Sequence, residues 1–281
     1  MGSVIILIVG LKEDILGNVS PITRLITILV ASLIFISNLD SYPILNFNLF
    51  NDVYEYKLFK IIFYVLAISA LANGVNMIDG MNGLASFSVI SMLSSIVLLS
   101  FIFEEYELIK TSIYIILAII GFMVFNFPKG LIFMGDTGAY WLGWVTGLLI
   151  IKLFSINGNI STWCVVLITS YPIIEVLFSA IRKIINGYSP FEADHKHIHI
   201  KLFFAISKNK DNSNLLNGLV TICLMPLWFI PLSLVAWIDK FPILVLFSIL
   251  LQISIYLIYY FILPDPDKKE YLKLFNKYKL K

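Results

Sequence analysis

The stretch GLASFSVISMLSSIVLLSFIF, residues 83–103, decides the fold class. It holds 21 residues without a single charge, and an α-helix needs about 20 apolar residues to cross the hydrocarbon core of a bilayer. Its apolar residues form a continuous run rather than the alternation that is typical of a membrane β-strand. The stretch therefore predicts a transmembrane helix.

The rest of the chain repeats this pattern. Apolar runs of similar character lie at 22–37, 58–75, 111–126, 131–153, 160–184, 213–237 and 241–263. Together the runs predict an all-α fold, a polytopic membrane bundle of about eight full transmembrane helices in a single membrane-embedded domain, residues 1–281. Residues 1–11 are also apolar, but they would rise only about 17 Å as a helix. We expect them to be an N-terminal partial helix, the tail of a helix whose beginning is missing.

The overall composition excludes the soluble globular class. Hydrophobic residues make up 59% of the chain, charged residues make up 14%, and the mean hydropathy is +0.90, whereas soluble domains are about half apolar and a quarter charged. The two cysteines, Cys164 and Cys223, lie inside apolar runs, so we interpret them as small packing residues.

Lysine and arginine are divided unequally between the two predicted sides of the membrane. With residues 12–21 placed in the cytoplasm and the helices alternating in direction, the inner segments hold fifteen of these residues and the outer segments hold five. Cytoplasmic loops carry the excess of Lys and Arg in membrane proteins. The bias predicts a cytoplasmic histidine-containing loop at 184–212 and a basic cytoplasmic tail at 264–281.

The same alternation brings several polar clusters to one side. The clusters LKEDILG (11–17), NGVNMIDGMNG (73–83), FNFPKGLIFMGDTG (125–138) and the histidine-containing loop all fall on the inner side. The outer loops contain acids but no comparable density of Asn, Gly and Asp. We therefore expect one site at the inner membrane surface.

The second cluster spaces its polar side chains three apart, at Asn73, Asn76, Asp79 and Asn82. Residues three apart share one face of a helix, so the four side chains could line one wall of a site. A polar helix end followed by a turn would give the same pattern. We favour a functional role, because acidic residues at the ends of spans are costly and usually functional.

The third cluster places Asp136 at the start of a predicted span. A carboxylate at that position interacts favourably with the helix dipole, and it is equally suited to be an oxygen ligand of Mg²⁺. Gly135, Ala139, Gly143 and Gly147 recur every four residues. This spacing of small residues predicts a seam for close helix packing.

Two further groups of charges are less specific. Glu13 and Asp14 are adjacent acids, which in a loop are usually just solvated. Glu175, Ser179 and Arg182 share one face of a predicted helix. A glutamate inside a span needs a partner, and we expect Arg182, directly or through Ser179. A structural ion pair explains this group at least as well as a substrate contact.

All three histidines of the chain fall in SPFEADHKHIHIKL, residues 189–202, at positions 195, 197 and 199. In an extended segment all three would share a face. A zinc site needs three or four nitrogen or sulfur ligands, and the only extra candidates nearby are Asp194 and Glu192. We prefer phosphate or substrate handling to zinc, because cysteine ligands are lacking.

Five stretches together resemble one family. GLKEDILG, NGVNMIDGMNGLA, FNFPKGLIFMGDTGAYWLG, YPIIEVLFSAIRK and SPFEADHKHIHIKL are similar, in this order, to motifs of the polyprenyl-phosphate N-acetylhexosamine-1-phosphate transferases. That family, glycosyltransferase family 4, also contains the phospho-N-acetylmuramoyl-pentapeptide transferases. The resemblance covers residues 5–205, and the last motif looks more like the N-acetylhexosamine branch.

The resemblance implies a Mg²⁺-dependent glycosyl-1-phosphate transferase, with Mn²⁺ as a substitute ion, in the bacterial inner membrane with its active site facing the cytoplasm. Such an enzyme transfers an N-acetylhexosamine-1-phosphate from a UDP-sugar to undecaprenyl or another polyprenyl phosphate and releases UMP. This is the first membrane step of a surface polysaccharide such as lipopolysaccharide O-antigen or teichoic acid. The implied partners are the lipid, the UDP-sugar and the membrane, with a homodimer as an option and no nucleic acid.

The resemblance also implies roles for single residues. Asp136 with Asp79 would hold the metal, and Asp14 would orient or deprotonate the lipid phosphate. The expected catalytic residues are Asp14, Asp79, His197 and His199, whereas His195 falls outside the family's His-x-His positions. The expected substrate-binding residues are Glu13, Asn73, Asn76, Asn82, Asn126, Phe133, Arg182, Asp194 and Lys196. Phe133 would stack on the uracil, and the histidines would stabilise charge on the diphosphate.

The sequence departs from the family pattern at several points. Glu13 stands where the family usually has Asp, Asn82 where many members have Asp, and Ile200 where many have another His. Family members also carry further helices before the paired acids, and we expect this chain to lack them. Two alternatives therefore stay open: an inactive truncated homologue, and a membrane transporter, which would need ionisable residues near the bilayer midplane.

Overall fold

The computed structural model describes residues 1–44, 55–158, 160–192, 194–207, 213–235 and 242–266. Within these ranges every regular element is a helix, which confirms the predicted all-α fold. The helices are α1 (Gly2–Leu16), α2 (Pro21–Ile36), α4 (Lys57–Ile78), α5 (Leu84–Ile102), α6 (Tyr106–Asn126), α7 (Gly135–Ile156), α8 (Thr162–Ile168), α9 (Ser170–Ile185), α10 (Ile198–Ser207), α11 (Ser213–Cys223), α12 (Met225–Val235) and α13 (Pro242–Ile262).

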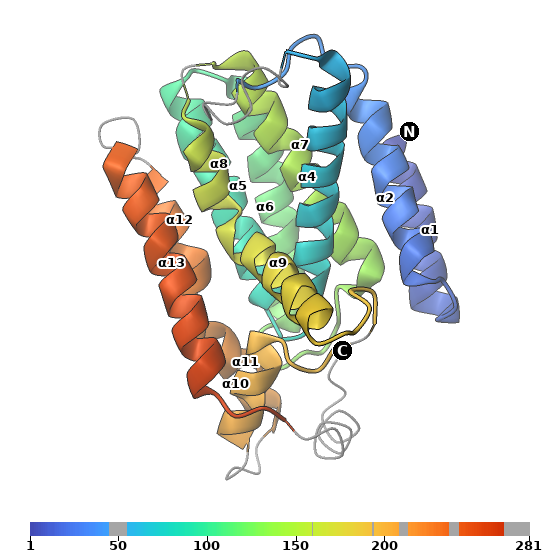
Figure 1. Cartoon of the computed structure of the whole chain (residues 1–281), viewed down its shortest axis with the longest axis vertical. Coiled ribbons are helices and arrows are strands. Elements are labelled where there is room, and N and C mark those ends of the chain that lie inside the picture. Colours follow the sequence, from blue (N-terminus) through green and yellow to red (C-terminus); the bar gives the residue numbers. More distant parts are fainter. Residues whose placement is uncertain (45–54, 159, 193, 208–212, 236–241, 267–281) are drawn as a thin grey trace.

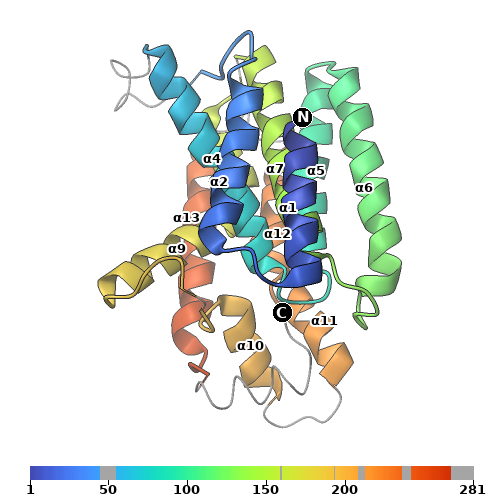
Figure 2. The same ribbon diagram turned by 90° about the vertical axis from the view of Figure 1, so that its right-hand side faces the viewer.

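Two antiparallel helices, α4 and α7, lie at the centre of the bundle (Figure 1). α1 packs on α7, and α2 packs on both α1 and α4. On the other side, α5 packs on α6, α7 and α12, and Figure 2 shows α6 at the edge of the bundle farthest from α9. Helices that are distant in sequence thus meet around the α4–α7 pair.

Small residues let α4 and α7 approach closely. A Cβ atom added at Gly143 would lie only 2.7 Å from the Cα atom of Ala72, a separation that no larger side chain can accommodate without moving a backbone. At Gly147 the nearest atoms belong to Ile68 and would be 3.5 Å away, an ordinary contact. The predicted small-residue seam is therefore confirmed at Gly143, its tightest point, and at Gly147, whereas Gly135 faces the Asp14 carboxylate.

All eight predicted spans form helix, but not as eight straight helices. α4, α5, α6, α7 and α13 are long and apolar enough to cross a membrane. α8 and α9 form a pair bent by 76°, and α11 and α12 form a pair bent by 44°. α2 has 16 residues, fewer than the about 20 that a span needs. The multi-pass architecture is confirmed, and the described residues contain five straight candidate spans, or up to seven when each bent pair is counted as one span.

The N-terminal helix extends further than the predicted partial helix. α1 continues to Leu16, so Glu13 and Asp14 lie in its last turn rather than in a loop. It ends at Gly17, which has φ of 60° and donates its N–H to the carbonyl of Glu13. A glycine readily adopts this left-handed conformation at a helix C-terminus. The helix therefore gives the two acids a fixed direction.

The chain bends sharply between α8 and α9, and α9 points away from the bundle (Figure 2). At the bend the hydroxyl of Ser170 contacts the carbonyl of Leu167 and the side chain of Gln252 in α13. Beyond it, Pro172 packs on α4, where a Cβ atom at Gly74 would lie 2.6 Å from the Pro172 carbonyl oxygen. The bend thus brings α9 against α4.

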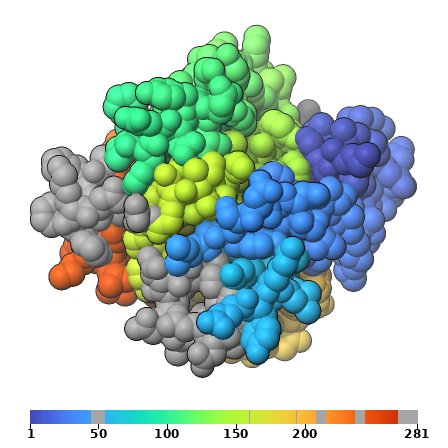
Figure 3. Space-filling view, turned by 90° about the horizontal axis from the view of Figure 1, so that it is seen from above, coloured from blue at the N-terminus to red at the C-terminus, as the bar shows by residue number. Residues whose placement is uncertain are grey.

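The polar clusters lie at one end of the bundle, where α1, α4 and α9 end and where α7 and α10 begin (Figure 1). At the other end the segment after α2 crosses the end of α7 (Figure 3), and the Ser41 hydroxyl donates to the Ser155 carbonyl at 3.0 Å. The predicted loop at 184–212 and tail at 264–281 fall partly outside the described residues, at 193, 208–212 and 267–281.

Candidate active site

Asp14 is bound to the N-terminus of α7. Its Oδ1 accepts a hydrogen bond from the Asp136 N–H at 2.7 Å, and its Oδ2 accepts from the N–H and hydroxyl of Thr137 at 3.1 and 2.6 Å. Gly135 permits this approach, because its φ is 72° and a Cβ atom there would lie 2.5 Å from Asp14 Oδ2. The Asp14 carboxylate therefore caps a helix end whose dipole favours negative charge.

Asp136 is buried where α2, α4 and α7 meet, with 8% of its surface exposed. Its Oδ1 accepts a hydrogen bond from Asn76 Nδ2 at 3.1 Å, and its Oδ2 is paired with the Arg24 guanidinium. The same guanidinium lies 3.8 Å from Glu13 Oε1. Arg24 is thus shared by two carboxylates on different helices.

Arg24 is the residue of this network that the sequence interpretation missed as part of the site. It is the only charged residue within α2. A charge inside an apolar run is usually functional, so this isolation is the signal that could have found it. Glu13 has a further partner, because its Oε2 accepts the N–H of Val19 at 2.7 Å and holds the turn after α1.

The prediction that Asn73, Asn76, Asp79 and Asn82 share one helix face is wrong beyond Ile78, because α4 ends there. Asn76 does face the site, through its bond to Asp136, but Asn73 donates to a carbonyl of its own helix at 2.7 Å. Asp79 follows the last helical residue, and its N–H donates to the Asn76 carbonyl at 3.2 Å. Asp79 therefore stays beside the site, one turn beyond Asn76.

Asn82 and Asn126 hold two loops together. The Asn82 side chain donates to the Pro128 carbonyl at 2.9 Å. The Asn126 side chain accepts the Gly83 N–H at 2.7 Å and donates to the Ile132 carbonyl at 2.8 Å. Both side chains are already bonded to protein groups, so they shape the loops on either side of the carboxylates. Direct substrate contact by either residue stays a prediction.

Phe133 lies in an apolar groove of about 440 Å³ between α6 and the start of α7. Its surface is 54% exposed. The other lining residues are Tyr114, Ile115, Ala118, Ile119, Phe122, Ile132, Met134, Gly138, Trp141 and Leu142. The ring is exposed and so is available for stacking, and the predicted uracil contact stays a prediction.

The histidine motif meets α9 and the loop after α4. His197 Nδ1 lies 2.8 Å from Glu175 Oε1. The rings of His197 and His199 stack, with centroids 5.6 Å apart and planes within 3° of parallel. A Cβ atom at Gly80 would lie 2.4 Å from His199 Nε2, so His199 touches the residue that follows Asp79. The structure therefore brings His197 and His199 to the same end as Asp79.

Burial makes His199 a neutral side chain at pH 7. Its surface is 1% exposed. Burial, together with the neighbouring His197, lowers the pKa of His199 to about 3, despite the nearby Glu175 carboxylate. A neutral imidazole offers a hydrogen bond rather than a charge. His195 is partly exposed.

The expected ion pair between Glu175 and Arg182 is wrong. Arg182 pairs instead with Asp194, which also accepts from the Ser179 hydroxyl at 3.2 Å and from the Lys196 N–H at 3.0 Å. Burial would raise the pKa of Asp194, but His197, Arg182 and the Lys196 N–H lower it to about 2. The predicted substrate-binding residues Arg182, Asp194 and Lys196 therefore also fix the loop that precedes α10.

The atoms at this end of the bundle that could bind a metal ion are oxygen atoms. The part of the chain that the structure describes holds no group of three or more His, Cys, Asp or Glu side chains placed around one ion. The parallel rings of His197 and His199 do not converge as zinc ligands would. Asp136 offers the carboxylate oxygens that Mg²⁺ prefers, since this ion takes one or two carboxylates and completes its shell with phosphate and water. The predicted magnesium site at Asp136 and Asp79 stays a prediction.

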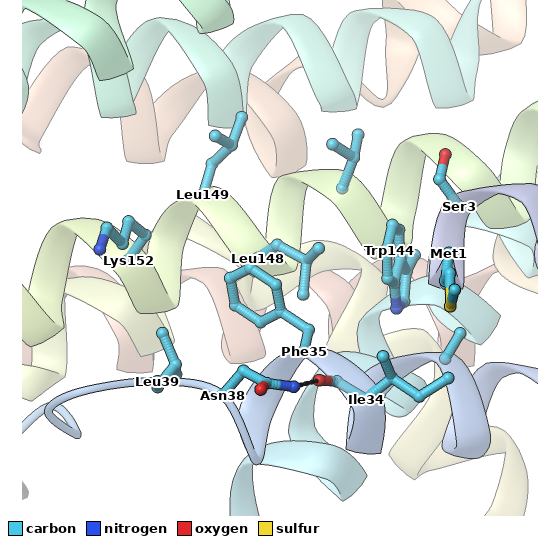
Figure 4. Close-up of a pocket in the computed structure, with 13 residues that line it drawn as sticks. Met1, Ser3, Ile34, Phe35, Asn38, Leu39, Trp144, Leu148, Leu149 and Lys152 are labelled. Carbon is cyan, nitrogen blue, oxygen red and sulfur yellow. Dashed lines mark hydrogen bonds between the residues drawn. The ribbon is translucent and has the colours of Figure 1, made fainter.

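A second cavity, of about 540 Å³, lies between α1, α2 and α7 (Figure 4). Phe35, Trp144 and Leu148 contribute to its apolar wall, and Lys152 is the one charged side chain among the described residues that line it. Lys152 follows Asp136 along α7 by 16 positions, a rise of about 24 Å. The cavity therefore lies away from the carboxylates.

Comparison with known protein families matches this chain to one family. The sequence model described as "Glycosyl transferase family 4" matches residues 1–154, more than half of the chain. The matched region contains Asp14, Arg24, Asp79 and Asp136, and ends before the histidine motif.

Several curated proteins are similar in sequence. A probable undecaprenyl-phosphate N-acetylglucosaminyl 1-phosphate transferase of Bacillus subtilis (strain 168) is 29% identical over 209 residues, covering 72% of this chain and 56% of the relative. An undecaprenyl-phosphate alpha-N-acetylglucosaminyl 1-phosphate transferase of Thermotoga maritima is 29% identical over 138 residues, covering 49% and 41%. A phospho-N-acetylmuramoyl-pentapeptide-transferase of Lactococcus lactis subsp. cremoris (strain MG1363) is 29% identical over 149 residues, covering 52% and 44%. The chain spans about half the length of the curated relatives it matches.

Proposed function

Because this chain belongs to glycosyl transferase family 4, we propose that it transfers an N-acetylhexosamine-1-phosphate from a UDP-sugar to a polyprenyl phosphate. An oxygen of the lipid phosphate attacks the phosphorus next to the sugar, and the bond from that phosphorus to UMP breaks. The products are the lipid diphosphate sugar and UMP. The reaction takes place on the cytoplasmic side of a bacterial inner membrane and begins the synthesis of a surface polysaccharide.

The observation that carries this proposal is the network of Asp14, Arg24, Asn76 and Asp136 at one end of four helices. Phosphoryl transfer depends on positioning and on neutralising charge more than on covalent chemistry. The network supports both, because two carboxylates and a guanidinium are held by hydrogen bonds to rigid helices. Fifteen of the twenty Lys and Arg residues fall on this predicted side of the membrane, which supports the cytoplasmic orientation.

Mg²⁺, with Mn²⁺ as a substitute, is the proposed cofactor, held by Asp136 with Asp79. When bound, the ion would neutralise the charge of the diphosphate. Arg24 already balances the charge of Asp136 and is placed to contact phosphate as well. Asp14 orients the lipid phosphate. The second pKa of a phosphate is about 6, so no strong base is needed to remove its proton.

The histidines and Phe133 are the proposed contacts of the UDP-sugar. His197 is partly exposed beside Asp194 and supplies a ring nitrogen to the diphosphate. Phe133, exposed next to the start of α7, stacks on the uracil. The names of the Bacillus and Thermotoga relatives favour undecaprenyl phosphate and an N-acetylglucosamine donor as the first substrates to try.

Histidine variants test the proposal with a built-in control. His197→Ala and His199→Ala should each lower UMP release from UDP-N-acetylglucosamine strongly, because the two rings form one stack against Glu175 and Gly80. His195→Ala should have a mild effect, since His195 falls outside the His-x-His positions of the motif. Equal losses in all three variants would contradict the assignment and reopen a site shared by three histidines.

The acidic residues of the network favour a transferase over a transporter. Asp14 lies in the last turn of α1, Asp79 follows α4, and Asp136 lies in the first turn of α7. A transporter would place such groups near the bilayer midplane. Ion-driven uptake by vesicles that contain the purified protein, without UMP release, would favour the transporter.

A further inference from the structure

Glu175 is a buried carboxylate within an apolar part of α9. Its surface is 1% exposed, and it lies ten residues before the end of the helix at Ile185. Burying a carboxylate costs free energy unless the charge is paired and hydrogen-bonded. The one side chain ion-paired with it in the described part of the chain is His197, at 2.8 Å. The contact therefore offsets part of this cost, and Tyr256 interacts with the same carboxylate.

The contact fixes which edge of the His197 ring faces α9. An ionised carboxylate only accepts hydrogen bonds, so the proton between the two groups belongs to Nδ1 of His197. Nε2 lies on the opposite edge of the imidazole ring. Because the carboxylate occupies Nδ1, Nε2 is the ring nitrogen through which the partly exposed His197 side chain, 12% exposed compared with 1% for Glu175, can meet a ligand.

A series of contacts continues from His197 to the loop after α4. The parallel stack aligns the His199 ring with the His197 ring, and His199 fills the space over Gly80. Gly80 directly follows Asp79. Glu175 thus anchors a continuous series of contacts that runs from α9 through both histidines to the end of α4.

We propose that Glu175 is a positioning residue that holds His197 with the proton on Nδ1 and with Nε2 turned toward the phosphate groups. The proposal rests on the transfer reaction proposed above. When Nε2 takes the proton of the attacking lipid phosphate, the Glu175 carboxylate stabilises the resulting imidazolium, as the aspartate of a Ser-His-Asp triad does. In the described structure the bend after α8 makes this possible, because it brings α9 against α4.

A purely structural role makes a different prediction. If Glu175 only fills a polar gap in the core, its replacement would lower stability and the amount of active protein. It would leave the ring state of His197 and the kcat of the remaining folded enzyme unchanged. A positioning role predicts a change in both of these quantities, with little change in KM.

The chain has only three histidines, so nitrogen NMR of ¹⁵N-histidine-labelled protein in lipid nanodiscs can resolve each ring. The His195→Gln and His199→Gln variants assign the remaining signals to His197. Neutral His197 should carry its proton on Nδ1 in the wild-type protein, because ring nitrogens with and without a proton have distinct shifts. A wild-type spectrum with the proton of His197 mainly on Nε2 would overturn the proposal. This test needs no Glu175 variant and therefore does not depend on how such a variant folds.

The Glu175→Gln variant adds the kinetic readout. A glutamine can donate as well as accept, so both ring forms of His197 should then be populated. The kcat should fall by about 10²- to 10⁴-fold, the usual contribution of a positioned proton-transfer group, while KM stays close to that of the wild type. Glu107→Gln, an exposed position in the first turn of α6, is the matched control and should change neither quantity.

The two proposals can fail separately. Wild-type protein that transfers no sugar phosphate would contradict the proposed function, whereas the ring state of His197 is measured without substrate. A fall in kcat in Glu175→Gln with an unchanged His197 spectrum would overturn the positioning role and leave the transferase assignment intact.

Discussion

Replacing Gly80 by alanine tests whether the position of His199 governs transfer. The added Cβ atom would lie 2.4 Å from His199 Nε2, and ordinary contacts begin at 3.4 Å, so the ring has to move by about 1 Å. Gly80 is not among the glycines with positive φ, so the methyl group adds no backbone strain. A displacement of about 1 Å in a reacting group can cost about 10²-fold in rate.

The assay is UMP release per folded protein, with thermal unfolding measured on the same samples. Gly80→Ala should lose about 10²-fold in kcat, and overpacking of this kind typically costs about 1–3 kcal/mol in stability. Gly121→Ala in α6 is the control, because no atom lies within 4 Å of its added Cβ, and it should keep full activity. A Gly80→Ala enzyme with wild-type kcat would refute the reasoning that the His199 ring must stay in place.

Three further predictions concern packing, charge and pH. Gly143→Ala should destabilise the α4–α7 contact by about 1–3 kcal/mol, whereas Gly147→Ala should be nearly neutral, as thermal unfolding of both variants will show. Arg24→Gln should increase the rise in melting temperature on adding Mg²⁺, because Asp136 then lacks its cation; an unchanged rise would argue against a metal at Asp136. Asp194→Asn should reduce stability at neutral pH, since the native pKa of Asp194 is about 2 and the unfolded value is about 3.9. Its stabilising effect is complete above the unfolded value and is lost as the pH falls toward the native value, so the wild-type and variant melting temperatures should converge in acid.

The helical fold could be predicted from the sequence because continuous apolar runs leave few alternatives in lipid. The bends were not predicted, although each has a local sign in the sequence. The 76° break between α8 and α9 comes just before Pro172, and the 44° break between α11 and α12 comes just before Pro226, and a proline inside an apolar run tends to end or kink the helix. The break between α8 and α9 is accompanied by a contact between Ser170 and Gln252, which are 82 positions apart. Contacts at such a separation depend on how the helices assemble.

Some residues of the candidate site could likewise be predicted from the sequence, and others could not. Asp14, Asp136 and the histidines stand in recognisable motifs, and the structure gathers them at one end. Arg24 and Glu175 were not assigned to the site because their partners come from other elements, which spacing along the chain does not show. Spacing within one helix favoured Arg182 as the partner of Glu175, but the loop after α9 folds back and supplies Asp194 to Arg182.

The most direct test of the central claim is transfer by the purified full-length protein in lipid nanodiscs. The substrates are undecaprenyl phosphate and radiolabelled UDP-N-acetylhexosamines, and the readouts are UMP and labelled lipid. We expect equal amounts of UMP and lipid-linked sugar diphosphate, formed only with Mg²⁺ or Mn²⁺ and lost in Asp136→Asn. Absence of both products with every UDP-N-acetylhexosamine, from protein that is folded by thermal unfolding, would contradict the account.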